Sequence, residues 1–306
     1  MVSFRHHYSF MKVPPDELTL LLPVYNEIES LQQLLPGLLK LTESQGWKIL
    51  LVNDGSTDAS AEALDELCAR HGAKVVHHKV NRGYGGAIKS GIQHVETRFV
   101  ATIDADGQHD SAEIRGMIDL MQQSNADMVV GTRAGQPSAT WLRGLGKWLI
   151  KVVAARLMDH GFTDLQSGFK LFRSDLAKEF VNFLPDGFAA CDALALLFVS
   201  QGHKVVEKQI NALERTTGVS KIRYSVVFET VNEIIHLVFL FNPIRIFFPI
   251  SLFLFVLGCL WGIPYLLAGK GLSVGASVLV MGGGNTFLLG LISEQISRMR
   301  RPQHRP

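Results

Sequence analysis

Short apolar runs alternate with segments of helical periodicity along the first part of this 306-residue chain. The apolar runs are residues 18–23, 49–52, 75–78, 99–103 and 128–131. The helical patterns between them are residues 30–45, 59–71, 86–95 and 111–124. Strands that alternate with helices form a mostly parallel sheet that is covered on both faces. The predicted fold is therefore an α/β domain, in which ligands bind at the carboxyl ends of the strands.

A polar motif follows each of the first four apolar runs. The motifs are Tyr25-Asn26-Glu27, Asn53-Asp54-Gly55-Ser56, Asn81-Arg82-Gly83 and Asp104-Ala105-Asp106-Gly107-Gln108. Because the carboxyl ends of parallel strands meet at one edge of a sheet, we expect these loops to converge on one crevice. The last motif brings carboxylate and amide oxygens into a turn, and hard divalent cations prefer such ligands. Cations held in this way commonly also hold a phosphate.

Two other identities for these motifs fail on spacing. An EF-hand beginning at Asp104 needs Gly at its sixth position and Glu at its twelfth, where this chain has His109 and Arg115. The glycine-rich run 81–86 lacks the third glycine of a dinucleotide-binding motif, because Ile88 stands there. A tight entry into the following helix accounts for these glycines, although their backbone amides could face a phosphate. For the acidic motif, a solvated turn is the plain alternative.

Two long uncharged runs, residues 246–268 and 271–293, stand near the C-terminus. Each is long enough to cross a hydrocarbon core of ~30 Å. Lys270 lies between the two runs. The basic residues that flank the pair are Lys221, Arg223, Arg245, Arg298, Arg300, Arg301 and Arg305. Since positive charge marks the cytosolic side, we predict a multi-pass transmembrane hairpin with both termini in the cytosol. Small residues in the second run would also suit packing between copies in a homo-oligomer.

These patterns divide the chain into parts. They are a disordered N-terminus (1–17), a folded domain (18–224), an amphipathic interfacial helix (225–243), the transmembrane hairpin (244–297) and a basic cytosolic tail (298–306). Within the folded domain, a smaller lobe is expected from a helix at 141–158, the stretch 164–173 and a strand at 205–210. The net charge of +2 argues against nucleic acid as a partner. The three cysteines lack the spacing of a metal site or a disulfide framework.

Taken together, five motifs resemble the inverting family 2 glycosyltransferases of GT-A fold, over roughly residues 18–221. They are Pro23-Val24-Tyr25-Asn26-Glu27, Asp54-Gly55-Ser56-Thr57-Asp58, Asn81-Arg82-Gly83, Asp104-Ala105-Asp106 and Gly131-Thr132-Arg133. Further features are similar to the polyprenyl-phosphate sugar transferases, a group that includes dolichol-phosphate mannose synthase. They are Asp106-Gly107-Gln108-His109, Ser167-Gly168-Phe169-Lys170, and Arg215 with Lys221 ahead of the hairpin.

The resemblance implies roles in binding the sugar donor. The residues implied to frame the nucleoside are Pro23, Tyr25, Glu27, Val52 and Asp54, with Asp54 accepting a hydrogen bond from the base. Mg²⁺ or Mn²⁺ would be held by Asp106 and Gln108, with Asp104 nearby for the metal or the ribose. Ala105 belongs to the same donor-binding motif. Contacts with the donor phosphates are implied for Arg133, Arg215 and Lys221.

On the acceptor side, the implied contacts with a lipid phosphate are Arg143, Lys147, Ser167 and Lys221. Asp164 either orients or activates the acceptor, or only caps a turn. The implied catalytic set is therefore Asp104, Asp106, Asp164 and Arg133. The chain departs from the family in having Asn53 where Asp is frequent, Lys170 where Arg is common, and Asp110-Ser111 in place of a proline pair.

The expected activity is transfer of one sugar from a UDP- or GDP-linked donor to undecaprenyl or dolichyl phosphate. It would take place at the bacterial inner membrane or the endoplasmic reticulum membrane, with the catalytic domain in the cytosol. A processive polysaccharide synthase is disfavoured, because two spans make a poor channel and no Gln-x-x-Arg-Trp motif occurs. Transfer to another lipid or soluble acceptor, or a non-catalytic nucleotide-sugar-binding scaffold, remain as alternatives. The sequence does not discriminate between UDP and GDP.

Overall fold

The computed structural model describes residues 13–105, 110–132, 167–187, 189–210, 239 and 243–300. The chain forms two compact units, Met1–Thr230 and Val231–Pro306. The first contains a sheet and its covering helices, and the second contains two long apolar helices. We describe each unit by itself.

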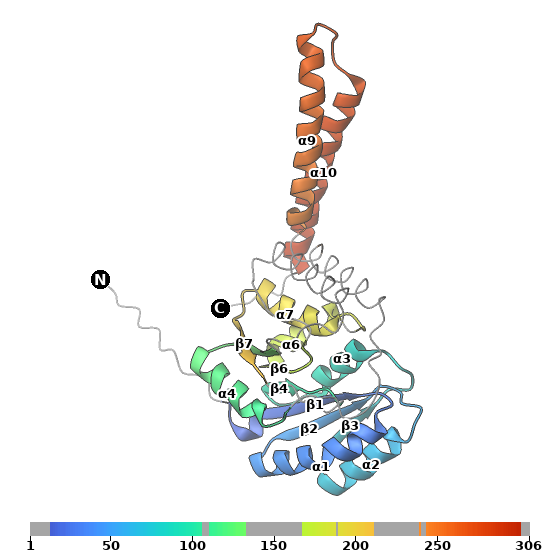
Figure 1. The fold of residues 1–306 in the computed structure, drawn as a ribbon, viewed down its shortest axis with the longest axis vertical. Helices are drawn as coiled ribbons and strands as arrows, with labels where there is room; N and C mark the ends of the chain where they lie inside the picture. The colour runs from blue at the N-terminus through green and yellow to red at the C-terminus, as the bar shows by residue number, and fades with distance from the viewer. Residues whose placement is uncertain are drawn as a thin grey trace, which may run out of the picture. The chain divides into compact units, whose positions relative to one another are not determined.

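A seven-stranded sheet forms the centre of the first unit (Figure 1). Its strands are β1 (Leu18–Val24), β2 (Lys48–Asn53), β3 (Lys74–His77), β4 (Phe99–Thr102), β5 (Met128–Thr132), β6 (Lys170–Arg173) and β7 (Val205–Gln209). Their order is β3-β2-β1-β4-β6-β5-β7. Within the described sheet, β6 alone runs antiparallel to its neighbours, which are β4 and β5. The mostly parallel α/β sheet predicted from the sequence is confirmed.

Helices cover both faces of this sheet (Figure 1). They are α1 (Ile28–Gln45), α2 (Ser60–His71), α3 (Tyr84–His94), α4 (Glu113–Ser124), α6 (Ser174–Phe180) and α7 (Ala190–Ser200), with short 3₁₀ turns at η1 (Pro15–Glu17) and η2 (Val181–Phe183). Alternate β1 residues face opposite ways, so Leu20 and Leu22 join the core beneath α1, α2 and α4. Leu21 points to the other face, where Gly91 lets α3 approach closely.

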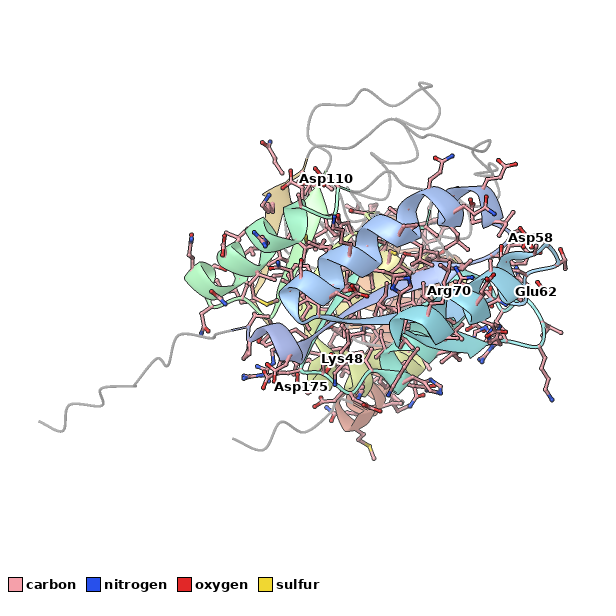
Figure 2. The ribbon with its side chains drawn as sticks, turned by 90° about the horizontal axis from the view of Figure 1, so that it is seen from below. Lys48, Asp58, Glu62, Arg70, Asp110 and Asp175 are labelled. Carbon is pink, nitrogen blue, oxygen red and sulfur yellow. The ribbon has the colours of Figure 1, made fainter. Side chains whose placement is uncertain are left out.

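The carboxyl ends of the parallel strands share one edge of the sheet. Figure 2 looks onto α1, α2 and α4 and places Asp58 and Asp110 away from Lys48 and Asp175. Asp58 and Asp110 follow the carboxyl ends of β2 and β4, whereas Lys48 begins β2. Asp175 follows β6, which runs the opposite way and therefore ends at the other edge. The described residues of the polar motifs after β1, β2, β3 and β4 thus lie at a common edge.

The predicted smaller lobe was wrong in one respect. The strand expected at 205–210 is β7, and it pairs with β5 in the main sheet. Between β5 and β7 in the chain, the structure also contains β6, α6 and α7, which the sequence patterns did not predict. The predicted helix at 141–158 lies outside the described residues, as does the interfacial helix at 225–243 apart from Phe239 and the residues from Pro243 onward.

The second unit pairs two helices, α9 (Ile244–Leu267) and α10 (Val274–Arg300). Each holds a 24-residue stretch that is long and apolar enough to cross a membrane, and most of each stretch is exposed. Small residues let the helices approach, because added Cβ atoms at Gly258 and Gly283 would meet the backbone of the opposite helix. An added Cβ at Gly290 would meet the side chain of Phe247. Ala276, Gly283 and Gly290 recur every seven residues, a spacing typical of helices that pack along a continuous seam.

Candidate functional site

The loops that follow β1 and β2 are tied together by hydrogen bonds. The Asn26 N–H donates to Ser56 Oγ at 3.1 Å, and the Thr57 N–H donates to Asn26 Oδ1 at 2.8 Å. The backbone of Asn26 is left-handed, with φ of 52°, a conformation that Asn tolerates better than most residues. The Glu27 N–H in turn donates to Ser60 Oγ at 3.3 Å. These bonds fix the two loops relative to one another beside the exposed side chain of Tyr25.

Asp54 is buried at the end of β2 with a defined orientation. Its residue is 2% exposed, and its Oδ1 atom accepts the Arg82 N–H at 2.9 Å. The ring of His78 lies 2.6 Å from the same oxygen through Nδ1. Gly55 makes this approach of the two segments feasible, because a Cβ there would lie 2.6 Å from the carbonyl carbon of Val80. The carboxylate predicted to meet the base is therefore held by the segment that follows β3.

Asn53, which departs from the family pattern, has a distinct set of contacts. Its Oδ1 accepts the Ser56 N–H at 3.0 Å, which assigns the other terminal atom as the amide nitrogen. That nitrogen donates to His77 Nδ1 at 3.0 Å, so His77 carries its proton on Nε2 and donates to Asp65 Oδ1 at 3.0 Å. An aspartate at position 53 would have no amide N–H to donate to His77. Asn53 thus links the loop after β2 to both β3 and α2.

Asp104 lies directly across from Gly168. Thr102 of β4 pairs with Lys170 of β6, and continuing this antiparallel register by two residues brings Asp104 opposite Gly168. A Cβ added at Gly168 would lie 2.5 Å from Asp104 Oδ1 and 2.7 Å from its Cγ. The Thr102 hydroxyl donates to the Gly168 carbonyl at 2.6 Å, which fixes the backbone there. A glycine is therefore required for Asp104 to keep its position.

Tyr84 orients the same carboxylate from the first turn of α3. Its hydroxyl donates to Asp104 Oδ1 at 2.9 Å. Burial, followed by the charge of Asp104, raises the pKa of Tyr84 well above its usual value, so the hydroxyl stays protonated and remains a donor. Cys191 lies beside this pair, and burial raises the pKa of its thiol to about 11. The thiol is therefore neutral at physiological pH and is not activated as a nucleophile.

Lys170 and Ser167 both point into the protein. Lys170 is 1% exposed, and its ammonium donates to the Ser167 carbonyl. Its positive charge also opposes the rise in the pKa of Cys191. Ser167 is 4% exposed, and its hydroxyl accepts the Phe169 N–H at 3.3 Å. Lys170 is thus a buried residue bonded to backbone. Ser167, predicted to contact a lipid phosphate, is buried in the turn before β6.

The glycine-rich run before α3 packs against another loop. The Gly86 N–H donates to the Asp186 carbonyl at 3.2 Å. A Cβ at Gly83, whose φ is 83°, would lie 2.6 Å from the Asp186 carbonyl oxygen, and one at Gly85 would collide with the Pro185 carbonyl oxygen. Close approach of this neighbouring backbone accounts for the glycines. The Gly86 amide, at least, is directed at protein rather than at a phosphate.

The remaining predicted residues fall into two sets. Pro23 and Val52 pair within the sheet and are buried, and Ala105 belongs to the core. Glu27 immediately precedes α1, and its carboxylate accepts the Ser30 hydroxyl at 3.0 Å. Residues outside the described part of the chain are Asp106, Gln108, Arg133, Arg143, Lys147, Asp164, Arg215 and Lys221. The roles given to all of these residues stay predictions.

The described edge of the sheet fits a hard cation in its donor chemistry. Asp104 supplies carboxylate oxygens at the carboxyl end of β4, and Asp106 and Gln108 follow it in the chain. Within the described residues, no group of three or more His, Cys, Asp or Glu side chains could hold a metal ion. The two other predicted ligands, Asp106 and Gln108, lie outside the described residues.

Sequence reasoning missed the residues that orient the two carboxylates. Tyr84 and Gly168 stood in motifs that were noted, but the antiparallel pairing of β6 was needed to place Gly168 beside Asp104. His78 and Cys191 carried no signal, because both become relevant only through contacts between distant segments. These supporting residues define the site more sharply than its acidic motif alone.

We expect the substitution Tyr84→Phe to lower the turnover number roughly 10-fold, because it removes the hydroxyl donor from Asp104 and leaves a less oriented carboxylate. The ring keeps its packing, so the melting temperature should change by no more than a few degrees. Steady-state kinetics and thermal unfolding of the same preparation check this. An unchanged turnover number would show that the hydrogen bond has no part in the activity.

Residues 19–181 match glycosyl transferase family 2, and the chain therefore belongs to this family. Residues 242–299 match the GtrB C-terminal hairpin, a region that includes both α9 and α10. The chain thus joins a family 2 domain to a region that matches this hairpin.

Relatives in the same family carry names of polyprenyl-phosphate sugar transferases. Undecaprenyl-phosphate 4-deoxy-4-formamido-L-arabinose transferase of Pseudomonas aeruginosa (strain UCBPP-PA14) is 30% identical over 317 residues, covering 94% of this chain and 86% of that protein. The enzyme of the same name from Edwardsiella ictaluri is 31% identical over 67% of this chain, which spans only 62% of that relative. Dodecaprenyl-phosphate galacturonate synthase of Rhizobium johnstonii is 26% identical, over 73% of this chain and 67% of that protein.

Solved structures confirm the GT-A fold predicted from the sequence. Glucosyl-3-phosphoglycerate synthase from Mycobacterium tuberculosis, in complex with phosphoglyceric acid, has a TM-score of 0.56 and 15% identity, covering 72% of this chain and 79% of that chain. The same enzyme in complex with Mn²⁺, UDP and glucosyl-3-phosphoglycerate gives a TM-score of 0.54 at 14% identity, with the same coverage. At this level of identity, the likeness concerns the fold.

Proposed function

We propose that this protein transfers one sugar from a nucleotide-diphosphate sugar to a polyprenyl phosphate. The observation that carries the proposal is the Asp104 carboxylate, oriented by Tyr84 and seated on Gly168 at the carboxyl edge of a family 2 catalytic domain. The names of the relatives support a polyprenyl phosphate as the acceptor. The apolar hairpin supports an acceptor that resides in a membrane.

This reaction depends more on positioning the acceptor phosphate than on removing a proton from it. A phosphate acceptor is already ionised near neutral pH, so its oxygen can attack the anomeric carbon without a strong general base. The leaving nucleotide diphosphate gains charge, and preorganised positive groups stabilise such charge. Arg133, Arg215 and Lys221 are the residues proposed for that task, and Arg143 and Lys147 for the acceptor phosphate. Asp164 would orient the acceptor.

Asp104, Asp106 and Gln108 are proposed to hold Mg²⁺ or Mn²⁺. When bound, the ion would neutralise charge on the diphosphate of the donor. The Tyr84 hydroxyl and the Gly168 backbone fix the direction of the Asp104 oxygens beforehand. Structures of the mycobacterial enzyme with Mn²⁺ and UDP, which share this fold, support the choice of cation.

The hairpin is proposed to anchor the enzyme in the cytoplasmic membrane, with the catalytic domain and both termini on the cytosolic side. Two features of the sequence support this orientation. Most of the charged residues that precede and follow the pair of spans are basic, whereas the turn between the spans holds one basic residue, Lys270. Copies would associate through small residues on the hairpin surface.

The test uses full-length protein purified in detergent, a polyprenyl phosphate and a panel of labelled nucleotide sugars. We expect a glycolipid product that disappears with EDTA and returns with Mg²⁺ or Mn²⁺. Asp106→Ala should lower its formation by a factor of 100 or more, since loss of one preorganised charge-stabilising group costs about 10²–10³ in rate. Asp110→Ala is the matched control, because Asp110 caps the turn before α4 and should leave transfer nearly unchanged.

Two results would contradict the proposal. One is the absence of any metal-dependent glycolipid for every sugar in the panel. The other is equal activity of the wild type and the Asp106→Ala variant. Transfer to a water-soluble acceptor in place of the polyprenyl phosphate would support the alternative in which the hairpin serves only as an anchor.

A further inference from the structure

A buried chain of hydrogen bonds runs from Asp54 through His78 to Ser90. His78 Nδ1 lies 2.6 Å from Asp54 Oδ1, and His78 Nε2 lies 2.7 Å from Ser90 Oγ. The side chains of Asp54 and His78 are 3% and 7% exposed, and Ser90 is 6% exposed. The chain connects the loop after β2, the segment after β3 and the middle of α3.

The direction of each hydrogen bond follows from Asp54. Its Oδ1 already accepts the Arg82 N–H, so this oxygen is an acceptor and the ring must donate to it from Nδ1. In the neutral ring Nε2 is then the acceptor, and it receives the Ser90 hydroxyl proton. Asp54 thus sets the tautomer of His78, Ser90 holds the ring through Nε2, and His78 in turn fixes the rotation of the Asp54 carboxylate.

This arrangement uses the two oxygens of Asp54 unequally. Oδ1 accepts two hydrogen bonds, one from Arg82 and one from His78, which occupy its two lone pairs. Among the described residues, no hydrogen bond reaches Oδ2. Oδ2 is not among the fully buried oxygens that lack a partner in the described structure, so it keeps access to the surface and is suited to receive a donor from a ligand.

We infer that His78, held by Ser90, is a positioning residue that leaves Asp54 one acceptor oxygen and thereby selects uracil over guanine in the donor nucleotide. The inference rests on the proposed function, in which Asp54 meets the base. The pairing edge of uracil offers one donor, N3–H, between two carbonyl oxygens. The same edge of guanine offers two adjacent donors, N1–H and N2–H, which suit a carboxylate with both oxygens available.

The test measures binding of UDP, GDP and CDP to the full-length protein in detergent with Mg²⁺, by isothermal titration calorimetry. Wild type should bind UDP at least about 10-fold more tightly than GDP, in line with the discrimination that a well-placed base contact provides. Cytosine has the same ring size as uracil but lacks N3–H. CDP therefore shows whether the protein recognises the N3–H donor or only the size of the base. It should also bind about 10-fold more weakly than UDP.

Substitutions of His78 separate positioning from packing. In His78→Asn the amide nitrogen takes the place of Nδ1, so the preference for UDP should stay within about 3-fold of wild type. In His78→Gln the amide nitrogen lies nearer the place of Nε2, so the preference should fall about 10-fold, as in His78→Ala. Ser90→Ala removes only the outer link and should reduce the preference about 3-fold.

His77→Ala is the matched control. His77 neighbours His78 on the same segment and also meets a carboxylate, that of Asp65, yet among the described residues no hydrogen bond or ion pair joins it to Asp54. Its removal should leave the ratio of UDP to GDP affinity unchanged. Melting temperatures of all variants show which of them remain folded.

The outcomes distinguish this inference from the proposed function. Equal affinity of wild type for UDP and GDP, with sugar transfer intact, would overturn the inference alone. Loss of the UDP preference in His78→Asn to the same extent as in His78→Gln would also overturn it, because position of the donor would then be irrelevant. Failure of wild type to bind any nucleotide would overturn both.

Discussion

Replacing Gly168 with alanine is expected to lower sugar transfer by about 100-fold or more. The added Cβ would lie 2.5 Å from Asp104 Oδ1 and 2.7 Å from Cγ, so the carboxylate must turn away. That rotation breaks the hydrogen bond from Tyr84 and redirects the oxygens proposed to hold the cation. A displacement of about 1 Å in a catalytic group can cost about 10² in rate. The measurement is the initial rate of glycolipid formation over a range of Mg²⁺ concentrations.

The control for this variant is Gly37→Ala on α1, where an added Cβ meets nothing within 4 Å. It should keep the activity of wild type. A double-mutant cycle adds a sharper test, because Gly168→Ala and Tyr84→Phe both act through Asp104. Their effects should fall well short of additivity. If Gly168→Ala keeps activity within about 3-fold of wild type, the position of Asp104 does not matter for the reaction.

Replacing Gly85 with alanine is expected to destabilise the catalytic domain by about 3 kcal/mol. The new Cβ would collide with the Pro185 carbonyl oxygen and lie 2.8 Å from that of Gly187 and 2.7 Å from the Ala190 Cβ. Two of these neighbours are backbone atoms, so relief requires movement of the loop that precedes α7. The melting temperature should fall by roughly 6–12 °C for a domain of this size.

Thermal unfolding followed by circular dichroism in detergent checks this prediction. Gly37→Ala again serves as the control, since alanine in an open helical position stabilises by about 0.5–1 kcal/mol. The same gain from helix propensity in α3 is too small to offset the collision at Gly85. A Gly85→Ala protein as stable as wild type would show that the loop at residues 185–187 packs less closely than described.

The sequence predicted the strands β1 to β5 because each of them contains a short apolar run. It failed at β6, where Lys170 interrupts the pattern although the residue is 1% exposed. The buried lysine is explained by its hydrogen bond to the nearby Ser167 carbonyl and by its place beside Cys191, which belongs to a distant segment. The helix α7 was missed for a related reason, since nearly all of its residues are buried and it has no polar face to show a period.

The candidate site was predictable in its positions and less so in its geometry. Four loops at one edge follow from strand direction alone, and the structure places the described residues of these loops there. The orientation of Asp54 and Asp104 depends instead on His78, Tyr84 and Gly168. Such contacts join residues 20 to 64 positions apart in the chain, which no local pattern records.

The position of β6 between β4 and β5 has a consequence for biosynthesis. The described partners of β5 are β6 and β7, and both come later in the chain. A nascent polypeptide that ends after β5 therefore carries that strand with both edges open. Unpaired strand edges promote association with other chains. When residues 170–173 emerge from the ribosome, they can pair with one open edge of β5 and with β4. The same pairing brings Gly168 opposite Asp104.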